Sequence, residues 1–206
     1  MFSCTRLRGS DPVLGVEMAS TGEVACHGQN KEEAFLKSLL STGFKMPEQN
    51  ILISCNADLI VEMTHAAYQL HESGYTLYAT CKTGETLQAN HVPCTIINFP
   101  TDDGQQGTSG HEDQNVLSVI KEKQIDMVID IPTHKLKRFE HNFLTRRTAV
   151  DFGILLLTNL QLVKVFADAV AMHKKDGLVG LDPQSLFEHY ENEKDDDAWT
   201  NKDEFH

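Results

Sequence analysis

The sequence predicts an α/β protein with a doubly wound, parallel five-stranded sheet. From residue 49 onward, five short apolar runs alternate with segments whose apolar residues recur at helical spacing. The short runs are predominantly apolar and do not alternate regularly with polar residues, which is typical of strands buried on both faces of a parallel sheet. Helices that join such strands cover both faces, so the pattern favours one core with a helical layer on each side.

Each predicted strand is a compact apolar run bounded by polar or turn-forming residues. Pro132 ends the fourth run because proline has no N–H group to donate within a sheet. The expected strands lie at 51–54, 76–79, 94–97, 127–131 and 154–157.

The predicted helices fill the intervals between the strands. Gly74 and Gly153 stand where two of them should end, because glycine readily adopts the left-handed conformation that closes a helix. Residues 100–113 are polar and rich in glycine, which predicts a loop. The expected helices lie at 59–73, directly after Thr83-Gly84, and at 115–123, 138–152 and 160–173.

Composition excludes several classes of protein. The chain has 206 residues, 40% of them apolar, which is enough for one good core. Its apolar runs are too short to span a bilayer, so no membrane partner is expected. Five cysteines without a CxxC pair indicate reduced thiols in an intracellular compartment. The ten histidines lack the spacing of a metal site, so neither a metal nor another cofactor is expected.

Charge is distributed unevenly along the chain. The net charge is −12, and residues 188–206 contribute eight acidic side chains against two lysines. This composition predicts that residues 181–206 form an acidic, disordered tail. An acidic chain also repels phosphates, so no nucleic-acid partner is expected.

The ends of the predicted strands are the expected ligand site, because ligands of doubly wound sheets bind beyond the carboxyl ends of the strands. The segment from Thr80 to Thr83 follows the second strand and opens a helix. Its hydroxyls, its backbone N–H groups and Lys82 suit a phosphate or a carboxylate. The alternative is that Thr83 only caps the helix.

Two charged features near this edge also allow two interpretations each. Asp130 ends a central strand and either pairs with Lys135 or Arg138 or takes part in ligand choice. Arg146 and Arg147 either attract an anion to the strand ends, or pair with acidic neighbours and support the fold. The expected acidic neighbours are Glu140 and Asp151.

Three motifs then point to a family. Met-Ala-Ser-Thr-Gly-Glu-Val at 18–24, Ser-Thr-Gly-Phe-Lys-Met-Pro at 41–47 and Arg-Arg-Thr-Ala-Val-Asp at 146–151 occur in this order. Together the motifs resemble the C-terminal part of the large synthetase region of carbamoyl-phosphate synthetases, and most closely the ammonia-dependent, N-acetylglutamate-activated branch. The resemblance runs from about residue 2 to about residue 190.

The resemblance implies a domain organisation. Residues 1–45 would be the tail of an ATP-grasp unit and its hinge. Residues 46–180 would be a methylglyoxal-synthase-like, Rossmann-like effector-binding domain, followed by the acidic tail at 181–206.

The resemblance also implies the residues that would contact the effector. N-acetyl-L-glutamate would bind to Thr80, Thr83, Phe99, Asp130, Thr133 and Asn142, with Lys82 and Arg146 as candidate anion support. Three of these residues depart from the family pattern, which has tryptophan at Phe99 and asparagine at Asp130 and Thr133. The change at Asp130 is the most serious, since an ionised carboxylate cannot donate to an anionic ligand and repels it. It could cost about 2 to 5 kcal/mol of binding free energy.

The function implied is that of a non-catalytic allosteric domain, which would be coupled to the ATP-grasp unit of a synthetase in nitrogen metabolism and the urea cycle. The chain itself would not be an enzyme, because the ATP-binding residues of such a synthetase lie upstream of the matching segment. One alternative is a free-standing binding or storage protein of the same fold that has lost the allosteric role. A methylglyoxal-synthase-type lyase is disfavoured, because residues 55–59 lack the histidine and lysine of the lyase motif.

Two further expectations concern location and assembly. The compartment would be the mitochondrial matrix for a urea-cycle-type enzyme and the cytoplasm otherwise. Four apolar residues at helical spacing predict a homodimer if they are exposed, and they are Phe35, Leu36, Leu39 and Leu40.

Overall fold

The computed structural model describes residues 10–13, 24–99, 115–132 and 141–176. Within these residues the centre of the protein is a five-stranded sheet in which every neighbouring pair of strands is parallel. The sheet confirms the predicted fold class. Its strands are β1 (Asn50–Cys55), β2 (Thr76–Thr80), β3 (Thr95–Ile97), β4 (Met127–Ile131) and β5 (Leu155–Leu157).

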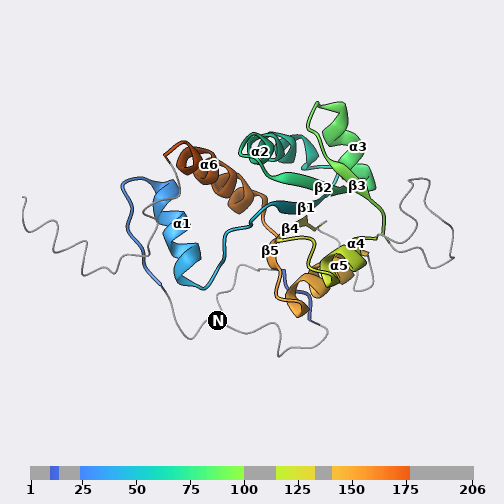
Figure 1. Cartoon of the computed structure of the whole chain (residues 1–206), viewed down its shortest axis with the longest axis horizontal. Helices are drawn as coiled ribbons and strands as arrows, with labels where there is room; N and C mark the ends of the chain where they lie inside the picture. Colours follow the sequence, from blue (N-terminus) through green and yellow to red (C-terminus); the bar gives the residue numbers. More distant parts are fainter. Residues whose placement is uncertain (1–9, 14–23, 100–114, 133–140, 177–206) are drawn as a thin grey trace, which may run out of the picture.

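Helices cover both faces of the sheet, as Figure 1 shows. The helices α2 (Ile60–Glu72) and α6 (Leu160–Asp176) lie on one face, and α4 (Val116–Lys121) and α5 (His141–Asp151) lie on the other. The first face also carries α3 (Cys81–Ala89), and α1 (Lys31–Ser41) packs against α6. Gly74 and Gly153 both have positive φ angles just beyond α2 and α5, as predicted.

The strand order β3-β2-β1-β4-β5 places a switch point between β1 and β4. The chain builds outward from β1 through β2 to β3, and then returns to the other side of β1 to form β4 and β5. In this arrangement connections leave the carboxyl ends of β1 and β4 in opposite directions. Ser54 stands beside Asp130 at this point, and Cys55 stands beside Ile131.

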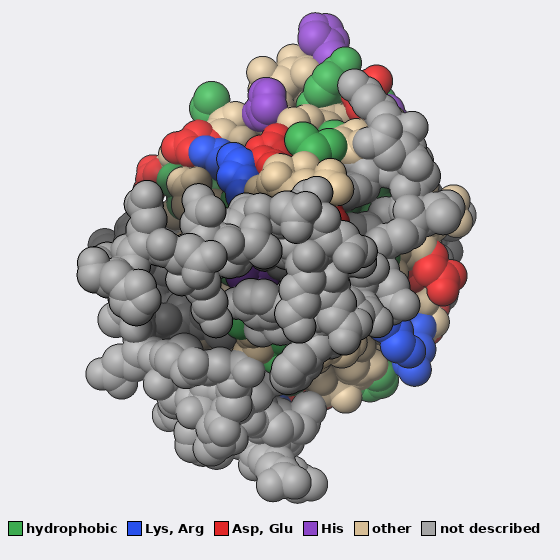
Figure 2. Space-filling view, turned by 90° about the vertical axis from the view of Figure 1, so that its left-hand side faces the viewer, with side chains coloured by type: hydrophobic (Ala, Val, Ile, Leu, Met, Phe, Trp, Pro, Cys, Tyr) green, Lys and Arg blue, Asp and Glu red, His purple; other side chains and the backbone are tan. Residues whose placement is uncertain are grey.

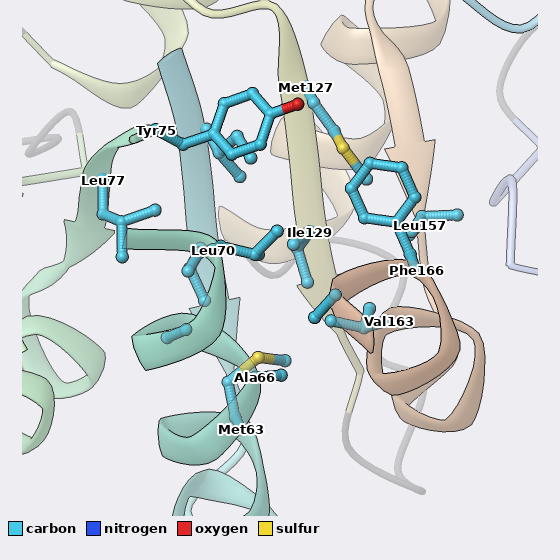
Figure 3. Packing of buried hydrophobic residues seen from close by; sticks show 14 of the residues in the cluster. Met63, Ala66, Leu70, Tyr75, Leu77, Met127, Ile129, Leu157, Val163 and Phe166 are labelled. Carbon is cyan, nitrogen blue, oxygen red and sulfur yellow. The ribbon is translucent and has the colours of Figure 1, made fainter. Parts of the chain in front are cut away.

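Two apolar clusters hold the layers together. The larger cluster fills the space between the sheet and the α2–α6 layer, where Met63, Ile129 and Phe166 are labelled in Figure 3. Phe166 also meets Phe44 edge to face, with ring centroids 6.0 Å apart. The smaller cluster lies beneath α4 and α5 and includes Leu52, Val128, Ile120 and Ala149.

The helix α1 contributes to the larger cluster. Asn30 caps its first turn by accepting a 2.8 Å hydrogen bond from the N–H of Glu33. Leu36 is 0% exposed, and Phe35 and Leu39 pack half-buried against the same core. The apolar face of α1 therefore packs against this domain. The homodimer was predicted only if this face is exposed, so this face gives no reason to expect a dimer. The domain boundary at residue 45 stays a prediction.

Several predicted features lie outside the described residues: the 100–113 loop, the acidic tail at 181–206, and Thr133, Lys135 and Arg138. On the side of the molecule seen in Figure 2, basic and acidic side chains lie next to one another. None of the described helices is both long enough and apolar enough to cross a membrane.

Candidate functional site

A hydrogen-bonded bridge joins the ends of β1 and β2 at the carboxyl edge of the sheet. The Thr83 hydroxyl accepts a 3.0 Å bond from the N–H of Cys55 and donates to the Cys55 carbonyl at 3.3 Å. The Thr80 hydroxyl donates to Thr83 Oγ1, also at 3.3 Å. Both threonines are buried. These contacts fix the start of α3 against the end of β1.

The bridge corrects the interpretation of Thr83 as a helix cap. The helix α3 begins at Cys81, four residues earlier than the start predicted directly after Gly84, and Thr80 takes the cap position without a side-chain capping bond. Thr83 therefore lies inside the first turn, and its hydroxyl is used in the contact with β1. The N–H groups of this first turn have no partner four residues earlier in a helix, and Lys82 is exposed beside them.

On the other side of β1, Asp130 forms a buried ion pair with Arg146. Arg146 Nη1 lies 2.7 Å from Asp130 Oδ2, and the side chains are 4% and 0% exposed, respectively. The same guanidinium donates from Nε and Nη2 to the two carboxylate oxygens of Asp11, at 2.8 and 2.6 Å. One arginine therefore holds two aspartates, which come from β4 and from the segment before α1.

The structure shows an acidic partner for each of the two arginines. Among the described residues, the cation that meets Asp130 is Arg146. The predicted partners Lys135 and Arg138 lie outside the described residues. Arg147 pairs with Asp151, as expected from their i,i+4 spacing. Asp11 was not expected from the sequence, and Glu140, the other predicted partner, lies outside the described residues.

Burial dominates the acid–base properties of this region. It raises the pKa of Asp130 to about 6, although Arg146 and a hydrogen bond from Ser54 act in the opposite direction. Asp130 Oδ1 has no hydrogen-bond partner among the described residues. Burial and the nearby Asp130 charge raise the pKa of the Cys55 thiol to about 12, so this cysteine is not a thiolate nucleophile at neutral pH.

Two other predicted residues lie on the face of the sheet covered by α4 and α5. Phe99 is half-buried and packs against the smaller apolar cluster. Asn142 is half-buried on α5. It precedes Arg146 by four positions, and this spacing puts the two residues on the same side of the helix. Thr133 lies outside the described residues.

The strand-end site is therefore centred on β1. Cys55 bonds to Thr83, and Ser54 neighbours Asp130, which in turn is held by Arg146. We use the name strand-end site for these residues together with Thr80. No group of three or more potential metal ligands was found within the described ranges of the chain.

Comparison with known protein families gives a match for the part of the chain that contains this site. The model of the family described as "MGS-like domain" matches residues 62–158, from the first turn of α2 to the residue after β5. This chain carries an MGS-like domain. The match includes Thr80, Thr83, Asp130 and Arg146, whereas Asp11 and β1 lie before it.

The MGS-like domain has relatives among large enzymes. The chain is 48% identical to "carbamoyl-phosphate synthase (ammonia), mitochondrial" of Aquarana catesbeiana and 45% identical to the Homo sapiens protein of that name. Each alignment covers 92% of this chain but only 12% of the relative. "Multifunctional protein ura1" of Schizosaccharomyces pombe is 36% identical over 91% of this chain and 8% of its own length. The chain thus corresponds to a small part of each of these proteins.

Proposed function

We propose that this chain is a regulatory, effector-binding domain of a carbamoyl-phosphate synthetase, and that it takes a small anion such as N-acetyl-L-glutamate at the strand-end site. The observation that carries the proposal is the convergence of Thr80, Asp130 and Arg146 around the end of β1, at the switch point of the sheet. This is where doubly wound sheets bind their ligands. The 45–48% identity to ammonia-type synthases supports the same proposal.

The chemistry of this edge suits a carboxylate. The N–H groups of the first turn of α3 point out of the helix N-terminus, where the helix dipole favours negative charge. Lys82 stands exposed beside them. We assign Arg146 a supporting role, because three of its N–H donors already bind Asp11 and Asp130. Asn142, Phe99 and Thr133 would complete the contacts with the ligand.

The same arginine offers a physical route for allosteric coupling. Asp130 belongs to the strand-end site, whereas Asp11 precedes α1, and Arg146 binds both. A ligand that alters the Asp130–Arg146 pair would change the free energy of the contact with Asp11. Residues before α1 are those that resemble the ATP-grasp unit, which we propose as the partner of this domain. Coupling between the two sites is what regulation requires.

The remaining parts of the proposal follow from the relatives. Catalysis would belong to the ATP-grasp unit, so this domain would be regulatory and not enzymatic. Because two of the compared synthases are named as mitochondrial, we propose the mitochondrial matrix as its compartment.

Calorimetric titration with N-acetyl-L-glutamate at pH 5.5 tests the proposal. We expect saturable binding to the wild type. The affinity should fall roughly 10- to 100-fold in Thr80→Ala, because this variant loses a hydroxyl proposed to hydrogen-bond to the charged ligand. Thr80 is preferred to Thr83 because Thr83 also ties α3 to β1.

The matched control is Thr86→Ala on the same helix. Among the described residues, the Thr86 hydroxyl bonds to the Lys82 carbonyl within α3, so its loss should leave the affinity unchanged. Equal affinities in all three proteins would place binding elsewhere. Absence of binding by a chain with a normal melting transition would contradict the proposal and favour the free-standing alternative.

A further inference from the structure

Among the described residues, the buried cluster around Arg146 holds two carboxylates and one cation. Asp11 and Asp130 share a single guanidinium, so with both acids ionised the cluster carries a net charge of −1. The two acids are not equivalent. Asp11 is 22% exposed and has both oxygens bonded to Arg146, whereas Asp130 is 0% exposed and has only Oδ2 bonded to it.

The unpartnered oxygen of Asp130 is costly in its ionised form. A buried acceptor without a donor loses the hydrogen bonds it had in water, and the loss is larger for a charged group. The described groups that face Asp130 are Arg146 from α5, Asp11 from the N-terminal segment, and Ser54 and Cys55 from β1. Of these only Arg146 is a cation. The Ser54 hydroxyl also stabilises the ionised carboxylate, but none of these groups donates a hydrogen bond to Oδ1.

A proton on Oδ1 resolves this imbalance and changes what the residue can do. The protonated carboxyl is neutral, and its Oδ1–H is a donor, while Oδ2 continues to accept from Arg146. Burial already raises the pKa of Asp130 to about 6, so the neutral form is accessible near neutral pH. In this form Asp130 can donate to an anionic ligand in the way that an amide would, without repelling it.

We infer that Asp130 binds the anionic effector as a neutral carboxylic acid whose Oδ1–H donates to a ligand carboxylate, so that binding takes up one proton from solvent. This inference rests on the proposed function, because it concerns the same site and a ligand of the same class. The step is an acid–base equilibrium, in which hydronium or a buffer acid gives its proton to Oδ1: the bond from the proton to its donor breaks as the Oδ1–H bond forms, and the conjugate base stays in solution.

The inference fixes the direction of the pH dependence. Since the bound state favours protonated Asp130, the affinity is highest below the pKa of about 6 and falls as pH rises above it. Each further pH unit lowers the affinity about tenfold, which gives a roughly 100-fold loss by pH 8. The carboxylates of the ligand are ionised throughout this range, so their own titration contributes little.

The test is calorimetric titration of the full chain with N-acetyl-L-glutamate at pH 5.5 and pH 8.0, each in two buffers of different ionisation enthalpy. The difference in heat between buffers counts the protons taken up. We expect close to one proton at pH 8.0, clearly less at pH 5.5, and an affinity roughly 100-fold lower at pH 8.0. Asp130→Asn supplies an amide donor at every pH, so it should bind with the same affinity at both pH values and take up no proton.

Two controls establish whether the proton taken up belongs to Asp130. Asp168→Asn changes an aspartate on α6 that bonds to Gln69, away from the strand-end site, and should keep the wild-type proton count. If Asp130→Asn does not fold, the side-chain carboxyl carbon signal of Asp130 in the wild-type chain replaces it. That signal should titrate near pH 6 without ligand and stay in the protonated range at pH 8 with saturating ligand.

The outcomes separate the inference from the proposed function. Binding without proton uptake, or binding that tightens as pH rises, overturns the inference and leaves the proposed function standing. Absence of binding in both the wild type and Asp130→Asn, with both proteins folded, overturns the proposed function and the inference with it.

Discussion

Replacing Arg146 with methionine is expected to lower the free energy of unfolding by about 3 to 5 kcal/mol, because it leaves a buried carboxylate without its cation. Asp130 is 0% exposed, and Arg146 is the cation that pairs with it. Methionine keeps much of the volume of the side chain but none of its charge, so packing changes little. The loss should be larger at pH 8 than at pH 5, since a protonated Asp130 no longer needs a compensating charge.

Urea unfolding at the two pH values measures this effect, and Arg147→Met is the matched control. Arg147 pairs with Asp151 one turn away, and because the Asp151 side chain is 45% exposed, water stabilises its charge when the arginine is removed. This substitution should therefore cost less than Arg146→Met, about 1 kcal/mol. Equal losses in the two variants would mean that Arg146 does not stabilise buried charge in the way the geometry indicates.

The second large effect is expected in α1, where Leu36→Ala should lower the free energy of unfolding by about 2 to 5 kcal/mol. Leu36 is 0% exposed and belongs to the larger apolar cluster. Truncation removes buried methyl groups and leaves a cavity between α1 and the rest of the core. A loss of this size is expected only if α1 folds as part of the same cooperative unit as the sheet.

Thermal and urea unfolding of Leu36→Ala should be compared with Leu40→Ala. Leu40 is on the same helix but only half-buried and outside the cluster, so it should cost less. If Leu36→Ala were as mild as Leu40→Ala, α1 would be a separate segment, as the predicted boundary at residue 45 implies.

The strands were predictable because their signal is local. Runs such as 51–54 and 127–131 are mostly apolar, with a polar residue only towards the end, and a short run of this kind is typical of a strand buried on both faces of a sheet. Helix ends were predictable where a glycine with a positive φ angle follows, as at Gly74 and Gly153. The edge of the sheet at which the candidate residues gather also follows from the alternation of strands and helices.

The start of α3 shows where local reasoning fails. Thr83 before Gly84 has the composition of a helix cap, and the sequence offers that role as the alternative to ligand binding. In the structure its hydroxyl bonds to Cys55, 28 positions earlier, and the helix begins before it. A tertiary hydrogen bond therefore outweighed the capping preference.

The Arg146 cluster was even harder to predict from the sequence. Its two aspartates lie 16 and 135 positions from the arginine, and no periodicity links residues so far apart. The nearer basic residues Lys135 and Arg138 were plausible partners for Asp130 by distance along the chain. The strand register and the direction of α5 bring the more distant Arg146 to it.

The measurement that tests the central claim most directly is the mapping of backbone amide shifts of the labelled chain during titration with N-acetyl-L-glutamate at pH 5.5. Binding at the strand-end site predicts that the largest changes lie at Cys55, from Thr80 to Thr83, and at Asp130. The opposite edge of the sheet, where Asp126 accepts bonds from the N–H groups of Gln49 and Asn50, should stay unchanged. Changes concentrated at that opposite edge, or absent at saturating ligand, would contradict the account.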